Sequence, residues 1–310
     1  MKTASEFLHT GEMSRRAFLA ATASCLTVAG MATGAPKPFK PRFAICNEVF
    51  GDWPFDKAFA FAAEAGYQGI EFAPFTVAND VRTVSAARRK QVRAQAAEAG
   101  LEILGLHWLL AKTDGFHLTS ADEKVRRETT AYLKALTHFC ADLGGRLLIF
   151  GSPQQRSLAP GMTRAEGLQH AAEIIHGLLP VMEERDVTLA LEPLSPKSTN
   201  FLSTAAEAVE LIDKVKSPRC RLILDCLAMS TESSAIPDLI RRHKEHLVHV
   251  QVNDPNRQGP GFGELDFVPI LSALREIEYR GWLSVEVFDF SPGPERLARE
   301  SISYLKACLK

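Results

Sequence analysis

The sequence lacks the paired cysteines that bind structural zinc. Cysteine accounts for 6 of its 310 residues, and no two of them form a C-x-x-C pair. An odd number remains after residue 35, and the two nearest, Cys220 and Cys226, flank one predicted strand. The ends of such a strand lie farther apart than a disulfide reaches. We therefore expect no thiolate zinc cluster, and we interpret the cysteines as small buried residues.

A surplus of charge of either sign is also absent. The chain has 36 Lys and Arg residues against 37 Asp and Glu residues, which gives a formal net charge of -1. Proteins that neutralise many phosphates need a basic surface, so we expect no nucleic-acid partner. The apolar fraction of 46% and the charged fraction of 24% are ordinary for a globular protein. This composition excludes disorder, collagen and coiled coil.

The first 35 residues are predicted to be an export leader. Ser14-Arg15-Arg16-Ala17-Phe18-Leu19 is followed by an uncharged run over residues 17–35, which is typical of a twin-arginine signal peptide. The run is rich in Ala, Gly and Thr and only weakly apolar, so we expect cleavage near residues 32–35 and no lasting membrane anchor. The protein would then use the export machinery and reach the periplasm.

Residues 36–310 are predicted to form one (β/α)8 TIM barrel. Short β-prone segments alternate with longer amphipathic segments, and Gly66, Gly100 and Gly144 follow three of the predicted helices. The length is close to the ~250 residues that one such barrel needs. No G-x-G-x-x-G motif follows the first strand, so a doubly wound open sheet is the less favoured alternative. The expected strands are residues 43–47, 69–72, 102–107, 146–150, 188–192, 221–225, 247–252 and 282–287.

Polar side chains occupy the carboxyl ends of the last four predicted strands. Glu192, Asp225, Gln251 and Glu286 share one face, because side chains alternate with a period of two and apolar residues take the intervening positions. In a barrel these strand ends surround the active site. Three carboxylates and an amide oxygen there need either a cation or Arg and Lys partners across the barrel. We favour a hard or borderline divalent ion such as Mn²⁺ or Mg²⁺.

Two of these acids, Glu192 and Glu286, also form a natural acid and base pair. One glutamate can remove a carbon-bound proton while the other returns one to the substrate. A metal beside them would polarise the neighbouring carbonyl and make that proton easier to remove. The pattern therefore predicts proton transfer at a carbon next to a carbonyl.

These strand ends resemble those of the xylose isomerase-like barrels, and in particular of the ketose 3-epimerases. The resemblance covers residues 41–310, and it implies a metal-dependent sugar isomerase or epimerase that acts on a sugar or keto-sugar. It implies Mn²⁺ as the ion, with Mg²⁺, Co²⁺ or Zn²⁺ as alternatives. It also implies that Glu192 and Glu286 are both catalytic and metal-binding. The segments that carry it are Leu191-Glu192-Pro193-Leu194, Leu224-Asp225, residues 251–261 and Val285-Glu286-Val287-Phe288.

Three positions depart from the pattern of that family. Gln251, six residues before the family's substrate-binding arginine at Arg257, stands where the family has a histidine ligand, and we expect its carbonyl oxygen to ligate more weakly. His249 is an alternative ligand, although its place deeper in the barrel favours a hydrogen-bonded core histidine. Ala228 and Ser198 replace a substrate-contacting His and Glu. These losses leave open a keto-sugar or keto-glycoside lyase or dehydratase, or a carbohydrate-binding barrel without turnover.

Further polar or aromatic residues end the first three predicted strands. His107 and Trp108 end the third strand and could place an imidazole and an indole beside a sugar ring, while ordinary packing is the alternative. Glu71, at the end of the second strand, is a further candidate for substrate binding. Asn47 and Glu48, at the end of the first strand, also lie at the end of the barrel where the active site is expected. The loop 151–157 is a weaker candidate for contacting substrate, and the loop 259–263 is a weaker candidate for a lid. Both signals are weak because loops are generally polar and rich in glycine.

Overall fold

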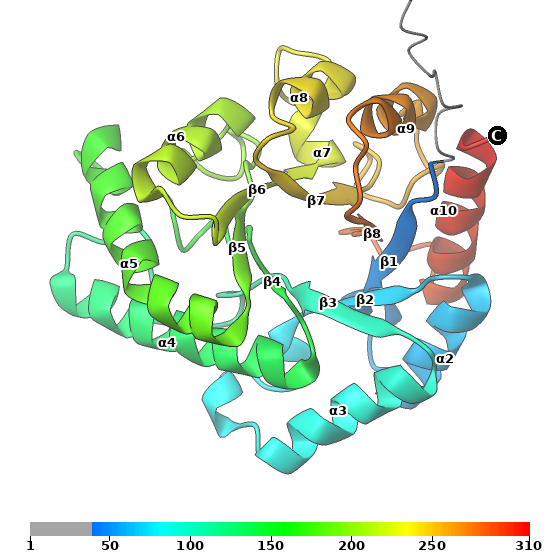
Figure 1. Cartoon of the computed structure of the whole chain (residues 1–310), viewed down its shortest axis with the longest axis horizontal. Coiled ribbons are helices and arrows are strands. Elements are labelled where there is room, and N and C mark those ends of the chain that lie inside the picture. Colours follow the sequence, from blue (N-terminus) through cyan, green and yellow to red (C-terminus); the bar gives the residue numbers. More distant parts are fainter. Residues whose placement is uncertain (1–38) are drawn as a thin grey trace, which may run out of the picture. The chain divides into compact units, whose positions relative to one another are not determined.

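The barrel is closed by eight parallel strands that follow one another in chain order (Figure 1). The structure is a computed structural model that describes residues 39–310, so the predicted leader over residues 1–35 lies outside the described residues. The prediction of a (β/α)8 TIM barrel in the described chain is confirmed. The strands are β1 (Arg42–Cys46), β2 (Gly69–Phe72), β3 (Glu102–Leu106), β4 (Leu147–Phe150), β5 (Thr188–Leu191), β6 (Cys220–Asp225), β7 (Leu247–Val252) and β8 (Trp282–Val285).

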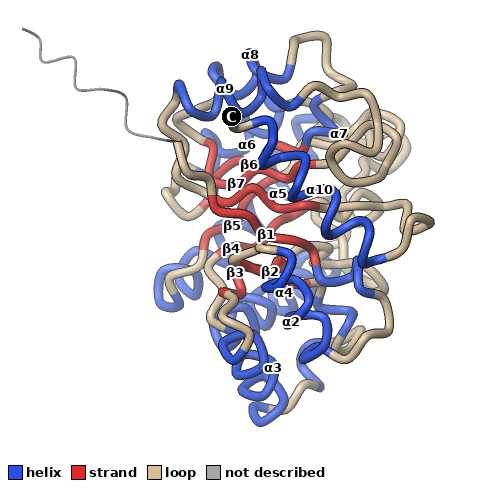
Figure 2. Tube along the Cα trace, turned by 90° about the vertical axis from the view of Figure 1, so that its right-hand side faces the viewer, coloured by secondary structure: helices blue, strands red, loops and turns tan. Residues whose placement is uncertain are grey.

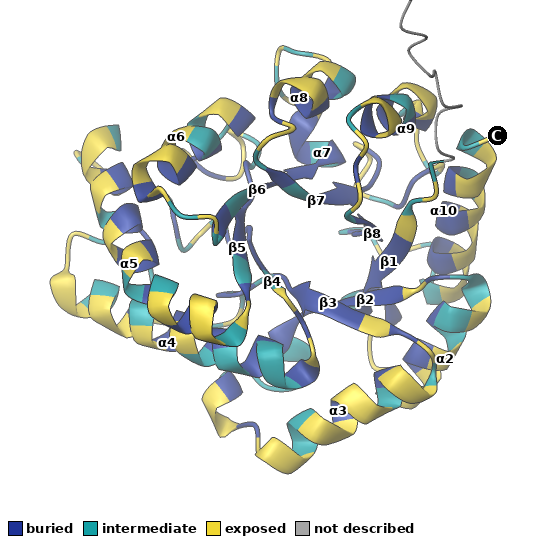
Figure 3. Ribbon diagram, viewed as in Figure 1, coloured by how far each residue is buried: buried dark blue, intermediate teal, exposed yellow. Residues whose placement is uncertain are grey.

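The helices surround the strands (Figure 2) and turn their exposed faces outward (Figure 3). Glycines in the left-handed conformation end two of them as predicted, with φ of 103° at Gly66 and 93° at Gly144. Among the described residues, no helix has the length and apolarity that crossing a membrane requires. The helices are α2 (Phe55–Ala65), α3 (Ala86–Glu98), α4 (Glu123–Leu143), α5 (Arg164–Arg185), α6 (Ala205–Val215), α7 (Cys226–Met229), α8 (Ile236–Arg242), α9 (Phe267–Glu276) and α10 (Pro294–Cys308), with 3-10 turns η1 (Asn47–Phe50), η2 (Pro74–Thr76) and η3 (Val81–Thr83).

Several strands end one or two residues earlier than the sequence predicts. Glu192 follows β5 because Pro193 has no N–H with which to extend the ladder. His107 likewise follows β3, and Glu286 follows β8. Asn47 begins η1 and accepts a hydrogen bond from the backbone N–H of Ala73 through its side-chain oxygen (2.7 Å). The polar residues therefore stand just above the ladder, where the chain turns into loops.

An apolar layer underlies the polar strand ends. Ile149, Ala190 and Ile223 are fully buried and pack against one another. Ala190 and Ile223 lie two positions before Glu192 and Asp225, which places each pair on one face of its strand. Glu192 and Asp225 therefore each follow an apolar residue of this layer on the same face of the strand.

The cysteines are all free in the described chain, as the sequence predicts, and four of them are buried. Cys220 begins β6 and Cys226 follows its last residue, so the two stand at opposite ends of the strand. The expectation that every cysteine is buried was wrong for Cys308, which lies at the end of α10 and is partly exposed.

Candidate active site

Three acids meet at the carboxyl ends of the strands. Glu192, Asp225 and Glu286, here called the acid cluster, each place a carboxylate oxygen within 4.8 Å of the others. All three are buried, with exposures of 5%, 2% and 4%. The sequence pattern of strands five, six and eight predicts this meeting. Ionised carboxylates that are this close together and shielded from water repel one another, unless a cation binds between them or some of them are protonated.

The pKa values of the acid cluster are all raised, first by burial and, in the two glutamates, also by neighbouring acids. Burial raises the pKa of Asp225 to about 6. Burial and then the charge of Asp225 hold the pKa of Glu192 well above its usual range. Burial and then the charges of Glu192 and Asp225 do the same to Glu286. Within residues 39–310, none of the three forms an ion pair with Arg or Lys, so the alternative of pairing across the barrel does not hold there.

Asp225 is held by two donors. Its Oδ1 accepts a hydrogen bond from the backbone N–H of Ala228 (2.7 Å), and its Oδ2 accepts one from Asn253 Nδ2 (2.6 Å). Asn253 is itself fixed, because its Oδ1 accepts from the N–H of Leu227 (2.7 Å). Asn253 is a functional candidate that the sequence interpretation missed. The signal was its position two residues after Gln251, which gives it the same facing.

Gln251 lies beside Asp225 in the register of β6 and β7 and is fully buried. Its Nε2 donates to Glu71 Oε1 (2.6 Å), which turns the amide oxygen away from Glu71. Among the described residues, Gln251 Oε1 has no hydrogen-bond partner, and neither has Glu286 Oε2. Three carboxylates and one amide oxygen, with an oxygen of Glu286 and that of Gln251 left without donors, are the ligand set that a hard or borderline divalent cation prefers. The residues present therefore fit such an ion.

In a second group of buried acids, histidines compensate the negative charge. Glu71, fully buried on β2, pairs through Oε2 with His249 Nε2 (2.8 Å), and its Oε1 lies 3.6 Å from His107 Nδ1. His107 Nε2 also pairs with Glu48 Oε1 (2.8 Å). Burial opposes the charge of Glu71, but the charge and hydrogen bond of His249, with His107, lower the pKa of Glu71 to about 2. We call Glu48, Glu71, His107 and His249 the histidine–glutamate cluster.

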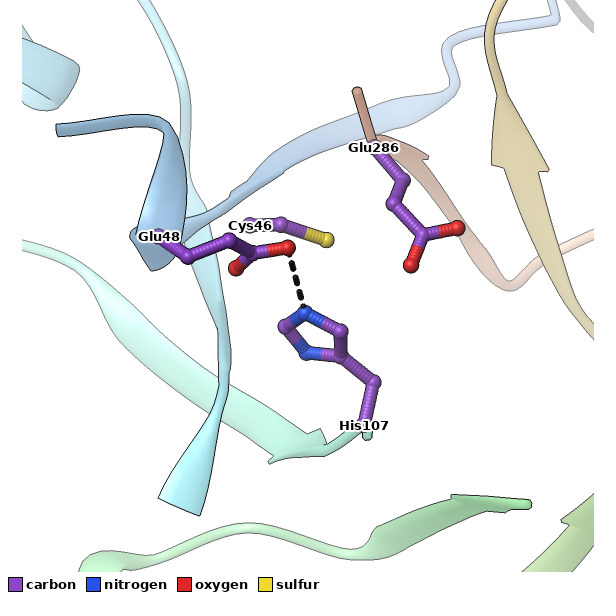
Figure 4. Close-up of side chains that lie close together, drawn as sticks. All are labelled: Cys46, Glu48, His107 and Glu286. Atoms are coloured by element: carbon purple, nitrogen blue, oxygen red, sulfur yellow. Dashed lines mark hydrogen bonds and ion pairs between the residues drawn. The ribbon is translucent and has the colours of Figure 1, made fainter. Parts of the chain in front are cut away.

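Glu286 stands between the two clusters. Figure 4 shows its carboxylate facing His107, with Glu48 bonded to the other side of the imidazole. Cys46, Glu48, His107 and Glu286 each place a ligand atom within 4.8 Å of the others. Burial raises the pKa of the Cys46 thiol well above its usual range, which keeps it protonated. Glu286 therefore lies close to His107 and Glu48 as well as to Glu192 and Asp225.

An inner cavity of about 220 Å³ opens above the acid cluster. The predicted residues His107, Trp108 and Arg257 line it together with the three acids. Glu71 and Gln251 are not among its lining residues, and they hydrogen-bond to each other. The role of Glu71 in substrate binding stays a prediction. The complete lining is His107, Trp108, Gly151, Ser152, Pro153, Glu192, Leu194, Ser195, Ser198, Asp225, Leu227, Ala228, Arg257, Glu286 and Phe288.

Two residues of the loop after β4 shape the surroundings of Glu192. A Cβ at Gly151 would collide with Glu192 Oε2, so a side chain at this position would displace the Glu192 carboxylate. Arg156 is fully buried and donates from its guanidinium to the backbone oxygens of Phe150 (3.3 Å) and Leu202 (3.5 Å). Burial lowers the pKa of Arg156 to about 10, against the opposing charge of Glu192. The sequence interpretation took this loop as a polar substrate loop and missed the buried cation.

Comparisons with known proteins agree with this architecture. Residues 59–308 match the family described as Xylose isomerase-like TIM barrel. The chain is 28% identical over 245 residues to L-ribulose 3-epimerase of Methylomonas sp. (strain DH-1), which covers 77% of this chain and 81% of that protein. It is 23% identical over 268 residues to 3-dehydro-D-guloside 4-epimerase of Escherichia coli (strain K12), which covers 84% and 98%.

A solved structure has the same fold at low sequence identity. D-psicose 3-epimerase, determined in the presence of D-fructose, superposes with a TM-score of 0.76 at 22% identity, covering 86% of this chain and 99% of that one. The family match spans most of the described barrel, from within α2 to the end of α10. The chain therefore belongs to the xylose isomerase-like TIM barrel family.

Proposed function

We propose that the protein is a divalent-metal-dependent sugar epimerase or isomerase that transfers a proton at a carbon next to a carbonyl. The observation that carries this proposal is the acid cluster, in which Glu192 and Glu286 face one cavity with Asp225 between their strands. The names of the relatives, L-ribulose 3-epimerase and 3-dehydro-D-guloside 4-epimerase, support the same class of reaction.

The two glutamates supply the proton chemistry. One carboxylate removes the proton from the carbon next to the carbonyl, and the other glutamate, carrying a proton, delivers it to the opposite face. The carbonyl is restored and the product is an isomer of the substrate, so no oxidant or leaving group is needed. The raised pKa of both glutamates suits groups that must exchange protons near neutral pH.

We propose Glu192, Asp225, Gln251 and Glu286 as the residues that hold the ion. When bound there, a divalent cation polarises the substrate carbonyl and makes the neighbouring proton more acidic. Mn²⁺ is our first choice, and Mg²⁺, Co²⁺ and Zn²⁺ remain alternatives. The orphaned oxygens of Gln251 and Glu286 support this assignment.

We propose that Trp108, Arg257 and His107 contact the sugar. Arg257 and Trp108 approach the ring of Phe288 from two sides, with centroid distances of 5.4 Å and 6.1 Å. An indole, a guanidinium and an imidazole around a small cavity suit a polyhydroxylated ring, which has apolar C–H faces and polar edges.

The test of this function is exchange of a carbon-bound proton with solvent. The Mn²⁺-loaded protein is incubated with ketoses in D₂O and followed by proton NMR, with chelator-treated protein as the control. We expect deuterium beside the carbonyl and the appearance of an epimer or isomer, both lost on chelation. An unsaturated product would identify a lyase or dehydratase instead. Absence of exchange with every ketose would favour a carbohydrate-binding barrel, and either outcome would overturn the proposal.

We further propose that the protein is exported through its twin-arginine leader. This rests on the sequence of residues 14–35 alone. Replacing Arg15 and Arg16 with lysine should leave the precursor in the cytoplasm, as measured by fractionation of cells and immunoblotting. Unchanged export of this variant would contradict the proposal.

A further inference from the structure

A second, larger cavity adjoins the inner cavity. Its volume is about 1000 Å³, and it shares Trp108, Pro153, Arg257 and Phe288 with the inner cavity. The rest of its wall comes from the segment 48–53, from Phe75, and from the loops after β3, β4 and β8. The two cavities are therefore neighbours that share these four residues as a common wall.

The two cavities differ in size in a way that bears on the substrate. Ligand pockets in proteins usually measure ~300–1,000 Å³. The inner cavity, about 220 Å³, lies below this range and suits one small ring, whereas the outer cavity lies at its upper end. A substrate of one sugar ring at the acid cluster would leave the outer cavity to solvent.

The wall of the outer cavity combines aromatic faces with hydrogen-bonding groups. Phe290 is one of two large apolar side chains that are strongly exposed within residues 39–310, with 45% of its surface accessible. It lies in the wall together with Phe50 and Trp53, and Asp52 and Gln154 supply polar groups nearby. Lys57 covers one face of Trp53 (3.6 Å), and Phe290 is the most exposed aromatic side chain of the wall. Aromatic faces beside carboxylate and amide groups match the apolar faces and hydroxyl edges of a sugar ring.

We propose that the outer cavity binds a second sugar ring, so that the substrate is a glycoside carrying its carbonyl-bearing ring at the acid cluster. This inference rests on the proposed function for the position of the reacting ring. The second ring would leave the inner cavity between Trp108, Arg257 and Phe288, the residues that both cavities share. It would then lie against Phe290 at the rim.

Binding of one-ring and two-ring ketoses tests this proposal. The full chain loaded with Mn²⁺ is titrated calorimetrically with D-fructose and with three disaccharides that attach a second hexose to fructose at different positions, namely turanose, lactulose and isomaltulose. We expect at least one disaccharide to bind about tenfold more tightly than D-fructose. Failure of all three to bind more tightly than D-fructose would overturn the proposal.

The variant Phe290→Ser tests whether the second ring binds at Phe290, where it would give the disaccharide its higher affinity. The matched control is Val268→Ser. Val268, on α9, is the other strongly exposed apolar residue (49%) and lines neither cavity. Phe290→Ser should remove most of the disaccharide gain and leave the affinity for D-fructose unchanged, whereas Val268→Ser should change neither. A disaccharide gain that survives Phe290→Ser would place the second ring elsewhere and contradict the proposal.

The readouts separate this proposal from the proposed function. If a disaccharide binds more tightly than D-fructose, the difference needs Phe290 and no proton exchange occurs, the outer-cavity site is upheld and the proposed epimerase function is overturned. Proton exchange on D-fructose without any disaccharide gain would uphold the epimerase and overturn the outer-cavity site.

Discussion

The acid cluster and the histidine–glutamate cluster occupy the same barrel mouth but compensate their charges differently. Glu286 and Glu71 are almost equally buried, at 4% and 0% exposure. The pKa of Glu286 is held well above its usual range by burial and neighbouring acids, whereas His249 and His107 lower that of Glu71 to about 2 despite its burial. Burial therefore does not decide the charge state here, and the partners do. Among the described residues, the cluster whose acids form no ion pair with Arg, Lys or His is the one that suits a cation and proton transfer.

The largest effect is expected from removing a catalytic carboxylate. Glu192→Gln and Glu286→Gln keep the size of the side chain but cannot accept a proton, so each should lower the rate of proton exchange by ~10²–10⁴-fold. Glu48→Gln, in the other cluster, should lower it by less than about tenfold. Deuterium incorporation measured by NMR, with circular dichroism to check folding, tests the difference. Equal losses in all three variants would erase the distinction between the clusters.

Stability should depend on the histidine–glutamate cluster. Removing one partner of a buried charged pair costs about 3–5 kcal/mol, so Glu71→Gln should lower the free energy of unfolding by an amount near the lower end of that range. Asp80→Asn is the matched control, because Asp80 pairs with Arg82 (2.7 Å) in an exposed position worth at most about 1 kcal/mol. Urea unfolding measures both, and equal losses would show that burial of the pair contributes nothing.

Wild type and Glu71→Gln can also be compared across pH, and the direction of the expected change is fixed by the pKa of Glu71. The pKa of Glu71 is lowered on folding from 4.5 to about 2, so its stabilising contribution is full above the unfolded value and is lost as pH falls toward the folded value. The stability difference between wild type and Glu71→Gln should therefore shrink across this acid range. A difference that grows on acidification would contradict the assignment of Glu71 as a buried carboxylate.

The eight strands and the acid cluster could be predicted because both follow from short-range periodicity. Alternation along each strand fixes the facing of Glu192, Asp225 and Glu286, and closure of the barrel brings these ends together. The pairing of Glu71 with His249 could not be predicted, because it depends on side-chain packing between residues 178 positions apart. For the same reason the sequence did not reveal that Arg156 is buried.

The smallest effects should come from Gln251, which links the two clusters. Gln251→Leu removes a neutral oxygen and should weaken Mn²⁺ binding by about 10–100-fold, a range typical of residues supporting a metal site. Gln251→His should tighten Mn²⁺ or Co²⁺ and make affinity more dependent on pH near ~6.5, because imidazole must lose a proton before it ligates. Calorimetric titration of the metal measures both. Unchanged affinity in both variants would remove Gln251 from the ligand set.

The most direct test of the central claim is thermal unfolding with and without Mn²⁺ at about pH 5 and about pH 8. In metal-free protein, the raised pKa values of the acid cluster mean that its contribution to stability is present at low pH and is lost as pH rises, through about 6 for Asp225. Mn²⁺ should therefore raise the melting temperature more at the higher pH, and Asp225→Asn should abolish most of that gain. A Mn²⁺ effect that is absent, larger at low pH, or unchanged in Asp225→Asn would contradict a cation site at the acid cluster.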